Sequence, residues 1–119
     1  IIDDIRFFFE QRIEYAIKNG LNEKNIILDP GIGFGKTIKD NDNIILNLNK
    51  FKELGFELLV GISRKSFLSK DKDDKINRLY PSLGVLAMSV MNGADIVRVH
   101  DVDETKQMLS IVDRIKYKK

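Results

Sequence analysis

The sequence predicts an α/β fold in which parallel strands alternate with helices. Three short runs rich in β-branched and aliphatic residues, at 26–29, 58–63 and 95–100, are each followed by a segment of helical periodicity. This alternation is typical of parallel βαβ crossovers, in a doubly wound sheet or a (β/α) barrel. Because three strands leave two unpaired edges, neither fold can be complete. We therefore interpret residues 1–119 as the carboxyl-terminal part of a (β/α)8 TIM barrel, an incomplete barrel whose amino-terminal strands are absent.

Composition limits the classes of function. The chain has 119 residues, of which 43% are hydrophobic and 32% charged, as in ordinary globular proteins. A net charge of +2 is too weak to predict nucleic-acid binding, and no apolar run is long enough to cross a membrane. The lack of cysteine excludes disulfides and thiolate metal sites. We expect a cytoplasmic protein, and the start at Ile1 rather than methionine suggests a piece of a longer one.

The first half of the chain is predicted to form a helix, a strand and a second helix. Apolar residues spaced three or four apart follow Asp3 and Asp4, either of which can cap the first helix. Gly20 supplies the left-handed end of that helix. The first strand stops at Asp29, where a proline and a glycine mark a turn. A second amphipathic helix is predicted over 41–54.

The second half is predicted to add two strands and two helices. The strand at 58–63 is apolar enough to be buried on both faces, and the charged segment 69–75 is predicted to be a solvated loop. A helix is expected over about 81–93, since the proline at its start is favoured in a first helical turn. The last helix is predicted over 101–117, with acids in its first turn and a lysine in its last.

Alternation along the third strand predicts which side chains point into the barrel. Ile96, Arg98 and His100 share one face, while Val97 and Val99 share the other. Helices must cover a purely apolar face, so the two valines are expected to point outward. The arginine and the histidine then point inward at the carboxyl end of the strand, where barrel enzymes carry their active sites.

The same alternation in the other strands adds one carboxylate, one lysine and a glycine to this face. The expected inward set is Asp29, Gly61, Ser63, Lys65, Arg98 and His100. The cationic members can share the charge of an oxyanion such as a phosphate. A lone carboxylate beside them suits an amidine-like N–C–N edge or a developing positive charge.

Each of these features also has an alternative explanation that the residues alone leave open. The turn after Asp29 can be structural, and Phe34 can belong to the core. His100 can simply lie beside the cap of the last helix. Arg98 can be the buried ion-pair partner of Asp29 or Asp95. Separate structural explanations at three successive strand ends are a less simple account of these residues than a single binding site.

The glycine loop after the first strand resembles a phosphate loop but fails its spacing. Gly31 and Gly35 are separated by three residues rather than four before Lys36 and the following threonine. Pro30 stands where the missing residue would be, and it has no N–H to donate to a phosphate. Nucleotide binding by this loop is therefore not expected. The single histidine also excludes a histidine-rich metal site.

Three motifs together point to one family. They are Asp-Pro-Gly-Ile-Gly-Phe-Gly-Lys at 29–36, Gly-Ile-Ser-Arg-Lys-Ser-Phe at 61–67 and Arg-Val-His-Asp-Val at 98–102. In this order and spacing the chain resembles dihydropteroate synthase, the barrel enzyme of the folate pathway. The resemblance covers nearly the whole chain and implies a transferase, with these motifs following strands six, seven and eight of its barrel.

The resemblance implies a role for each inward residue. Asp29 would hydrogen-bond a pterin ring, Lys65 would reach the carbonyl and nitrogen side of the ring, and Gly61 would leave room for it. Arg98 and His100 would hold the pyrophosphate leaving group. The resemblance also implies Mg2+, bound through the pyrophosphate or by a ligand outside this fragment, and no metal ligand among these residues.

The second substrate implied by the resemblance is p-aminobenzoate, in a pocket shaped by Phe34, Lys65 and Ser66 that sulfonamides also occupy. The reaction would join this amine to 6-hydroxymethyl-7,8-dihydropterin diphosphate and release pyrophosphate. The family pairs through helices near its carboxyl terminus, so a homodimer is expected. Because the family's amino-terminal strands complete the site, we expect the fragment alone to be inactive.

Two alternatives remain. One is a pterin-binding methyltransferase barrel with a corrinoid partner, in which the Ser-Arg-Lys-Ser loop and the Arg-x-His pair are not expected. The other is a non-catalytic barrel fragment that keeps the pocket for structural reasons.

Overall fold

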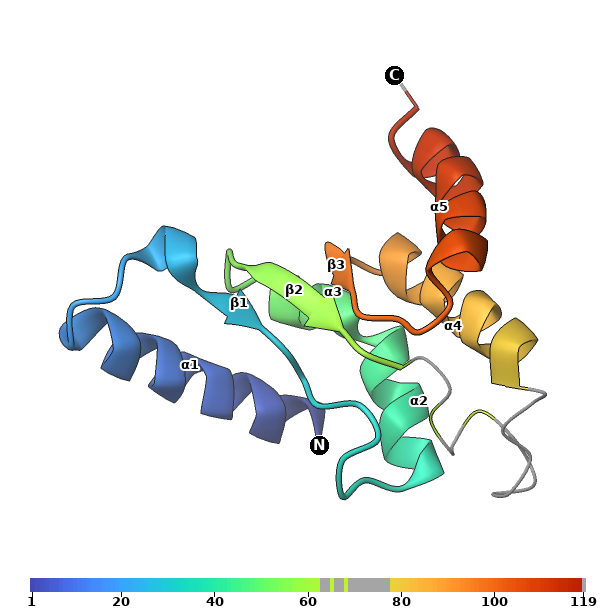
Figure 1. Ribbon diagram of the computed structural model, residues 1–119. Coiled ribbons are helices and arrows are strands. Elements are labelled where there is room, and N and C mark those ends of the chain that lie inside the picture. Colours follow the sequence, from blue (N-terminus) through green and yellow to red (C-terminus); the bar gives the residue numbers. More distant parts are fainter. Residues whose placement is uncertain (63–64, 66–67, 69–77, 119) are drawn as a thin grey trace.

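The structure, a computed structural model, describes residues 1–62, 65, 68 and 78–118 (Figure 1). Strands and helices alternate along this part of the chain, as predicted. No helix within it is long and apolar enough to cross a membrane. The elements in chain order are α1 (Ile2–Lys18), the 3-10 helix η1 (Glu23–Asn25), β1 (Ile27–Leu28), α2 (Ile38–Leu46), α3 (Leu48–Lys52), β2 (Glu57–Val60), α4 (Leu79–Met91), β3 (Ile96–Val97) and α5 (Val102–Lys116).

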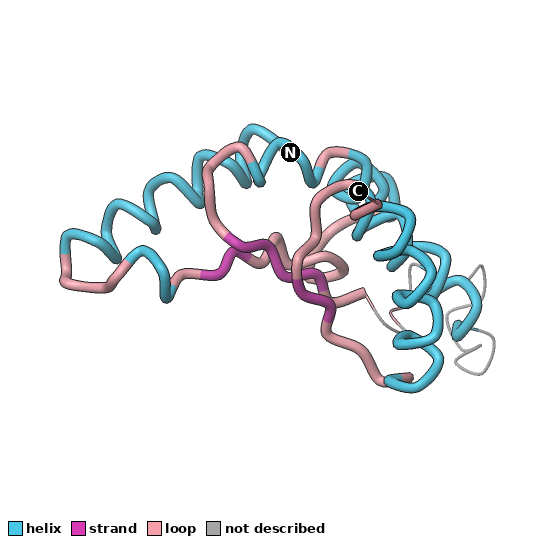
Figure 2. The backbone as a smooth tube through the Cα atoms, turned by 90° about the horizontal axis from the view of Figure 1, so that it is seen from above, coloured by secondary structure: helices cyan, strands magenta, loops and turns pink. Residues whose placement is uncertain are grey.

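The strands of the described residues form a parallel sheet in the order β1-β2-β3. Leu28 lies opposite Leu58, and Val60 lies opposite Val97. The carboxyl ends of the strands therefore meet at one edge of the sheet. Figure 2 shows the long helices gathered along one side of the strands, as in the wall of a barrel.

The helices cover the apolar face of the sheet. Leu58, Val60 and Ile62 are fully buried in the core between sheet and helices, and Val97 packs against this core from β3. On the opposite face Ile27 is 50% exposed. The predicted alternation is thus confirmed: apolar residues face the helices, and the other face is left for the barrel interior.

Two helix boundaries predicted from the sequence are wrong. The helix expected over 41–54 is two helices, α2 and α3, which meet at Asn47 (φ −116°, ψ 21°). The Asn47 side chain donates a hydrogen bond to the carbonyl of Asn43 at 2.7 Å, and such local bonds compete with continuation of a helix. In α1 no side chain caps the amino end, and Asp3 and Asp4 lie in the first turn, where the helix dipole favours them.

The remaining boundaries differ by a few residues. Each strand is shorter than predicted: β1 stops before Asp29-Pro30-Gly31 and β2 stops before Gly61, whereas the early end of β3 has no such residue after it. Helix α4 begins at Leu79, so Pro81 lies in its first turn, where it was expected. Gly20 adopts a left-handed φ of 95° after α1, also as expected. The predicted loop at 69–75 lies outside the described residues.

Beside β1 the edge of the sheet is open. A groove of about 520 Å³ runs between β1 and α1, and Phe8 and Ile27 in its wall are 57% and 50% exposed. Phe9, by contrast, is buried and meets Phe51 edge to face, with ring centroids 5.5 Å apart. An unpaired strand edge beside exposed apolar side chains is where the preceding βα unit of a complete barrel would lie.

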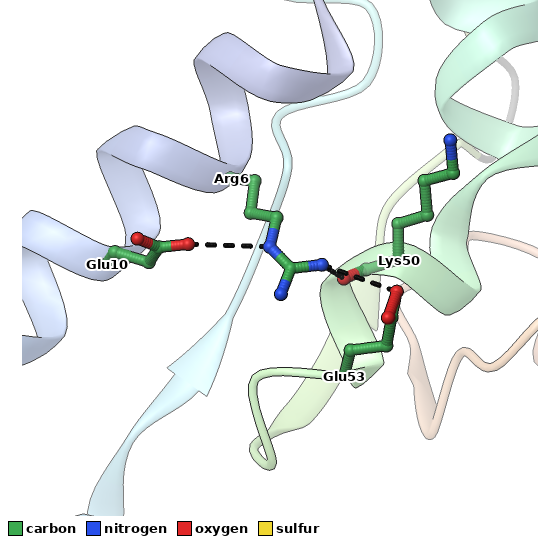
Figure 3. A network of polar contacts seen from close by, with 4 residues as sticks. All are labelled: Arg6, Glu10, Lys50 and Glu53. Carbon is green, nitrogen blue, oxygen red and sulfur yellow. Dashed lines mark hydrogen bonds and ion pairs between the residues drawn. The ribbon is translucent and has the colours of Figure 1, made fainter.

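Arg6 ties α1 to the end of α3. Its Nη1 donates to the carbonyl of Lys50 at 2.9 Å and lies 3.3 Å from Glu53 Oε1, while its Nε lies 3.4 Å from Glu10 (Figure 3). The carbonyl of Lys50 is in the last turn of α3, where carbonyl groups have no N–H partner within the helix. The arginine thus satisfies a helix end and fixes α1 beneath the sheet.

Asp95 joins the amino end of β3 to β2. Its Oδ2 accepts hydrogen bonds from Lys52 Nζ at 2.5 Å and from the N–H of Leu58 at 2.9 Å. Burial raises the pKa of Asp95, but these hydrogen bonds and the charges of Lys52 and Lys116 outweigh burial, so the pKa lies below its usual value.

We expect Asp95→Asn to lower the free energy of unfolding by about 1 kcal/mol at neutral pH, since the side chain is one-third exposed. A lowered pKa in the folded state stabilises the fold above the unfolded pKa of about 4, and this contribution is lost as the pH falls through the folded value. Denaturant titrations should show the difference from wild type shrinking below pH 4 or so. The exposed Asp42→Asn is the control, and a difference that persists in acid would contradict this assignment.

Candidate active site at the carboxyl ends of the strands

The ends of the strands bring most of the predicted site residues together. Gly61 and Lys65 follow β2, Arg98 and His100 follow β3, and these four line a cavity of about 130 Å³ with Val99. Asp29, at the end of β1, reaches the same cluster through Arg98. The sequence-predicted juxtaposition of these side chains is therefore seen in the structure. Ser63 and Ser66 lie outside the described residues.

Asp29 and Arg98 face each other across the cluster. Arg98 Nη1 lies 3.7 Å from Asp29 Oδ2, and the two side chains are 57% and 39% exposed. Of the ion pairs considered from the sequence, the pair of Arg98 with Asp29 is present, but it is exposed rather than buried, and Asp95 pairs with Lys52 instead. A loose exposed pair contributes little to stability, so both charges can be given to a ligand at small cost.

Gly61 is needed for the position of Arg98. A Cβ built on Gly61 would lie 2.5 Å from Arg98 Nη2 and 3.0 Å from its Cζ. The guanidinium therefore lies flat against the backbone of β2's extension, in space that any other residue would occupy. The missing Cβ at Gly61 leaves this space to the guanidinium.

The glycine loop wraps around one buried side chain. Ile32 is 1% exposed, and it is flanked by Gly31 and Gly33 with left-handed φ values of 68° and 89°. Asp29 Oδ1 accepts a hydrogen bond from the N–H of Gly31 at 2.8 Å, which orients the carboxylate. The loop is thus held by its apolar anchor, and its next side chain, Phe34, stands outside at 65% exposure.

Lys65 links this loop to the end of β2. Its Nζ donates to the carbonyl of Ile32 at 2.5 Å and lies 4.3 Å from the ring centroid of Phe34. Burial and the neighbouring charge of Arg98 lower the pKa of Lys65, Asp29 raises it, and the net direction is downward. Phe34 is a surface for an ammonium or another ring rather than part of the core, so the core alternative is wrong.

The described residues do not form a protein metal site. No group of three or more His, Cys, Asp or Glu side chains lies close enough among them to hold an ion. Asp29 is the carboxylate of the cluster, and it is engaged with Gly31 and Arg98.

Asn41 is a site-supporting residue that the sequence analysis missed. It is 1% exposed at the start of α2, and its Oδ1 accepts a hydrogen bond from the N–H of Gly33 at 2.8 Å. A signal existed, because Asn41 falls on the apolar stripe of Ile44 and Leu48 at helical spacing. A polar residue at a core position needs a buried partner, and here the partner is the glycine loop.

The fold and the site define the class of protein. Residues 1–100 match the family described as pterin binding enzyme, and the chain belongs to that family. Within it the chain is similar to dihydropteroate synthases. It is 41% identical over 117 residues to the dihydropteroate synthase of Synechocystis, a match that covers 97% of this chain and 40% of the relative.

Solved structures agree with this placement. The dihydropteroate synthase of Stenotrophomonas maltophilia, with imidazole bound in its active site, matches 99% of this chain and 45% of its own at 34% identity and a TM-score of 0.94. The Yersinia pestis dihydropteroate synthase in a sulfonamide drug complex matches 99% of this chain and 43% of its own at 34% identity and a TM-score of 0.93. The chain thus spans less than half of these relatives, and the prediction of a partial α/β barrel is confirmed.

Proposed function

We propose that the full-length protein, meaning a complete barrel that contains these residues, is a dihydropteroate synthase. The main support is the meeting, at three strand ends, of one carboxylate with an arginine, a lysine and a histidine in a chain of this family. The reaction joins p-aminobenzoate to 6-hydroxymethyl-7,8-dihydropterin diphosphate and gives 7,8-dihydropteroate and pyrophosphate.

The positions of the cluster residues support a placement for each part of the first substrate. The flat pterin ring lies beside Gly61, with its N–C–N edge on Asp29 and its carbonyl side on Lys65. The pyrophosphate lies on Arg98 and His100, at the end of β3. The exocyclic C–O bond breaks and its electron pair leaves with pyrophosphate, while the charge of Asp29 stabilises the carbocation that remains.

The amine of p-aminobenzoate then attacks the carbocation and loses a proton to solvent. Its ring lies beside Phe34 and Lys65, whose ammonium is 4.3 Å from the centroid of the Phe34 ring. The Yersinia pestis relative forms a complex with a sulfonamide drug, which is consistent with binding of an aromatic amine. Mg2+, when bound through the pyrophosphate, would supply positive charge to the leaving group, and Arg98 and His100 would hold the same group from the protein side. No step depends on a protein metal ligand from these residues.

The 119-residue chain alone is expected to be inactive, because the strands missing from the open edge of β1 would complete the site.

A homodimer is proposed through α4 and α5, whose outer faces carry Met91, Ile111 and Ile115 at 53%, 47% and 60% exposure. A cytoplasmic location is part of the same proposal.

Product formation tests the proposal. The full-length protein should form dihydropteroate and pyrophosphate in equal amounts from the two substrates, and the 119-residue chain should form neither. Methyl transfer from methyltetrahydrofolate to a corrinoid protein, without dihydropteroate formation, would establish the methyltransferase alternative. Growth without folate of a strain whose only copy carries both Lys65→Ala and Asp29→Ala would favour a non-catalytic barrel.

A further inference from the structure

The segment between the glycine loop and α2 contains a charged side chain that the proposed reaction does not use. Lys36 Nζ donates hydrogen bonds to the carbonyl of Gly31 at 2.8 Å and to the carbonyl of Phe34 at 3.1 Å. The N–H of Phe34 also donates to the carbonyl of Gly31, at 3.1 Å. The ammonium therefore bridges the two ends of the turn that carries Phe34.

The backbone at Lys36 is held in place by the start of α2. The next residue, Thr37, caps α2: its Oγ1 accepts the N–H of Asp40 at 3.1 Å, and Asp40 Oδ2 in return accepts the N–H of Thr37 at 3.4 Å. A Cβ on Gly31 would lie 3.3 Å from Lys36 Nζ, so the ammonium sits close against the backbone of the turn. The start of α2 and the turn are thus joined by one side chain.

The turn determines where the ring of Phe34 lies. Phe34 is 65% exposed, so core packing does not hold its ring. Among the described residues its ring contact is the ammonium of Lys65, 4.3 Å from the centroid, and Lys65 is itself bonded to the carbonyl of Ile32 in the same turn. An exposed ring on a glycine-rich turn keeps one position only if the backbone beneath it is held.

We propose that Lys36 is a positioning residue that holds Phe34 against Lys65 and so governs capture of the aromatic amine, without touching either substrate. This inference rests on the proposed function, because it assigns Phe34 to the amine pocket. The two donated hydrogen bonds occupy the ammonium and turn it toward the carbonyls, while the pyrophosphate is assigned to Arg98 and His100 at another strand end.

The first measurement needs no activity. In the full-length protein, Lys65 Hε protons should show an upfield ring-current shift in NMR spectra with labelled lysine, the signal being assigned by its loss in Lys65→Arg and the shift by its loss in Phe34→Leu. Lys36→Met should lose most of this shift. Lys36→Arg, which can donate to both carbonyls, should keep it, as should Lys39→Met, a neighbouring exposed lysine without a hydrogen bond or ion pair in the described structure.

The second measurement is kinetic and uses the full-length protein. Lys36→Met should raise the KM for p-aminobenzoate about tenfold, the effect expected for lost charged hydrogen bonds, and leave kcat and the KM for the pterin diphosphate within about twofold. Lys36→Arg should restore most of the amine affinity. An unchanged ring-current shift in Lys36→Met, or a lost shift with an unchanged KM for the amine, would overturn the inference. An inactive wild-type protein would refute the proposed function, and the NMR contrast would still decide whether Lys36 positions Phe34.

Discussion

Asp29→Asn in the full-length protein should reduce kcat/KM for the pterin diphosphate by about 100- to 1000-fold, the loss typical of removing one charge-stabilising group from an active site. The substitution keeps the shape of the side chain. Asparagine Oδ1 can still accept the N–H of Gly31, at 2.8 Å in the structure, so the glycine loop should keep its conformation. What is lost is the negative charge near the carbocation.

Two observations separate this effect from misfolding. Asp40→Asn is the matched control, because Asp40 also accepts a backbone N–H near the loop, that of Thr37, but belongs to the capping box of α2 and not to the cluster. The control should stay within about threefold of wild-type kcat/KM, a change of well under 1 kcal/mol. Since the charge of Asp29 raises the pKa of Lys65, its loss should lower that pKa further. Near-wild-type turnover by Asp29→Asn would remove the carboxylate from the mechanism.

Gly61→Ala should reduce kcat/KM about 100-fold with little change in thermal stability, since displacement of a site group by about 1 Å costs that much. The added Cβ would lie 2.5 Å from Arg98 Nη2, so the guanidinium must move. An exposed, flexible arginine end moves at small cost in stability. The pocket, however, loses both its flat floor and the placement of its arginine.

Gly84→Ala is the control for this change. Gly84 lies in α4, and an added Cβ there meets nothing within 4 Å. It should leave activity unchanged and slightly stabilise the helix, since alanine is the better helix former. If Gly61→Ala unfolded the protein instead, or left activity intact, the close approach of Arg98 to β2 would not be a functional feature.

The faces of the side chains at the strand ends could be predicted from the sequence, because side-chain alternation in a parallel sheet is a local rule. Arg98 and His100 could be placed on one face by parity, and Leu58 and Val60 on the other, without any knowledge of contacts. The break at Asn47 could not be found in this way, because apolar periodicity continues through it. There the side chain's own hydrogen bond to the preceding turn decides the boundary.

The support of the glycine loop was also beyond the sequence analysis. Lys36 was identified as a charge in the loop, but its bonds to two carbonyls depend on how the turn folds back. Asn41 was passed over although it occupies a core position in α2. Both bond to backbone groups of the loop, and these partners carry no sequence signature: the apolar stripe could mark Asn41 as a buried polar residue but could not name its partner.

The central claim is that the leaving group binds at the end of β3 rather than at the glycine loop, and a calorimetric titration tests it most directly. A pterin analogue would be titrated into the full-length protein with and without pyrophosphate. Pyrophosphate should raise the affinity of the wild-type protein for the analogue, and Arg98→Ala should abolish that gain while keeping measurable analogue binding. A gain that survives in Arg98→Ala would contradict the account.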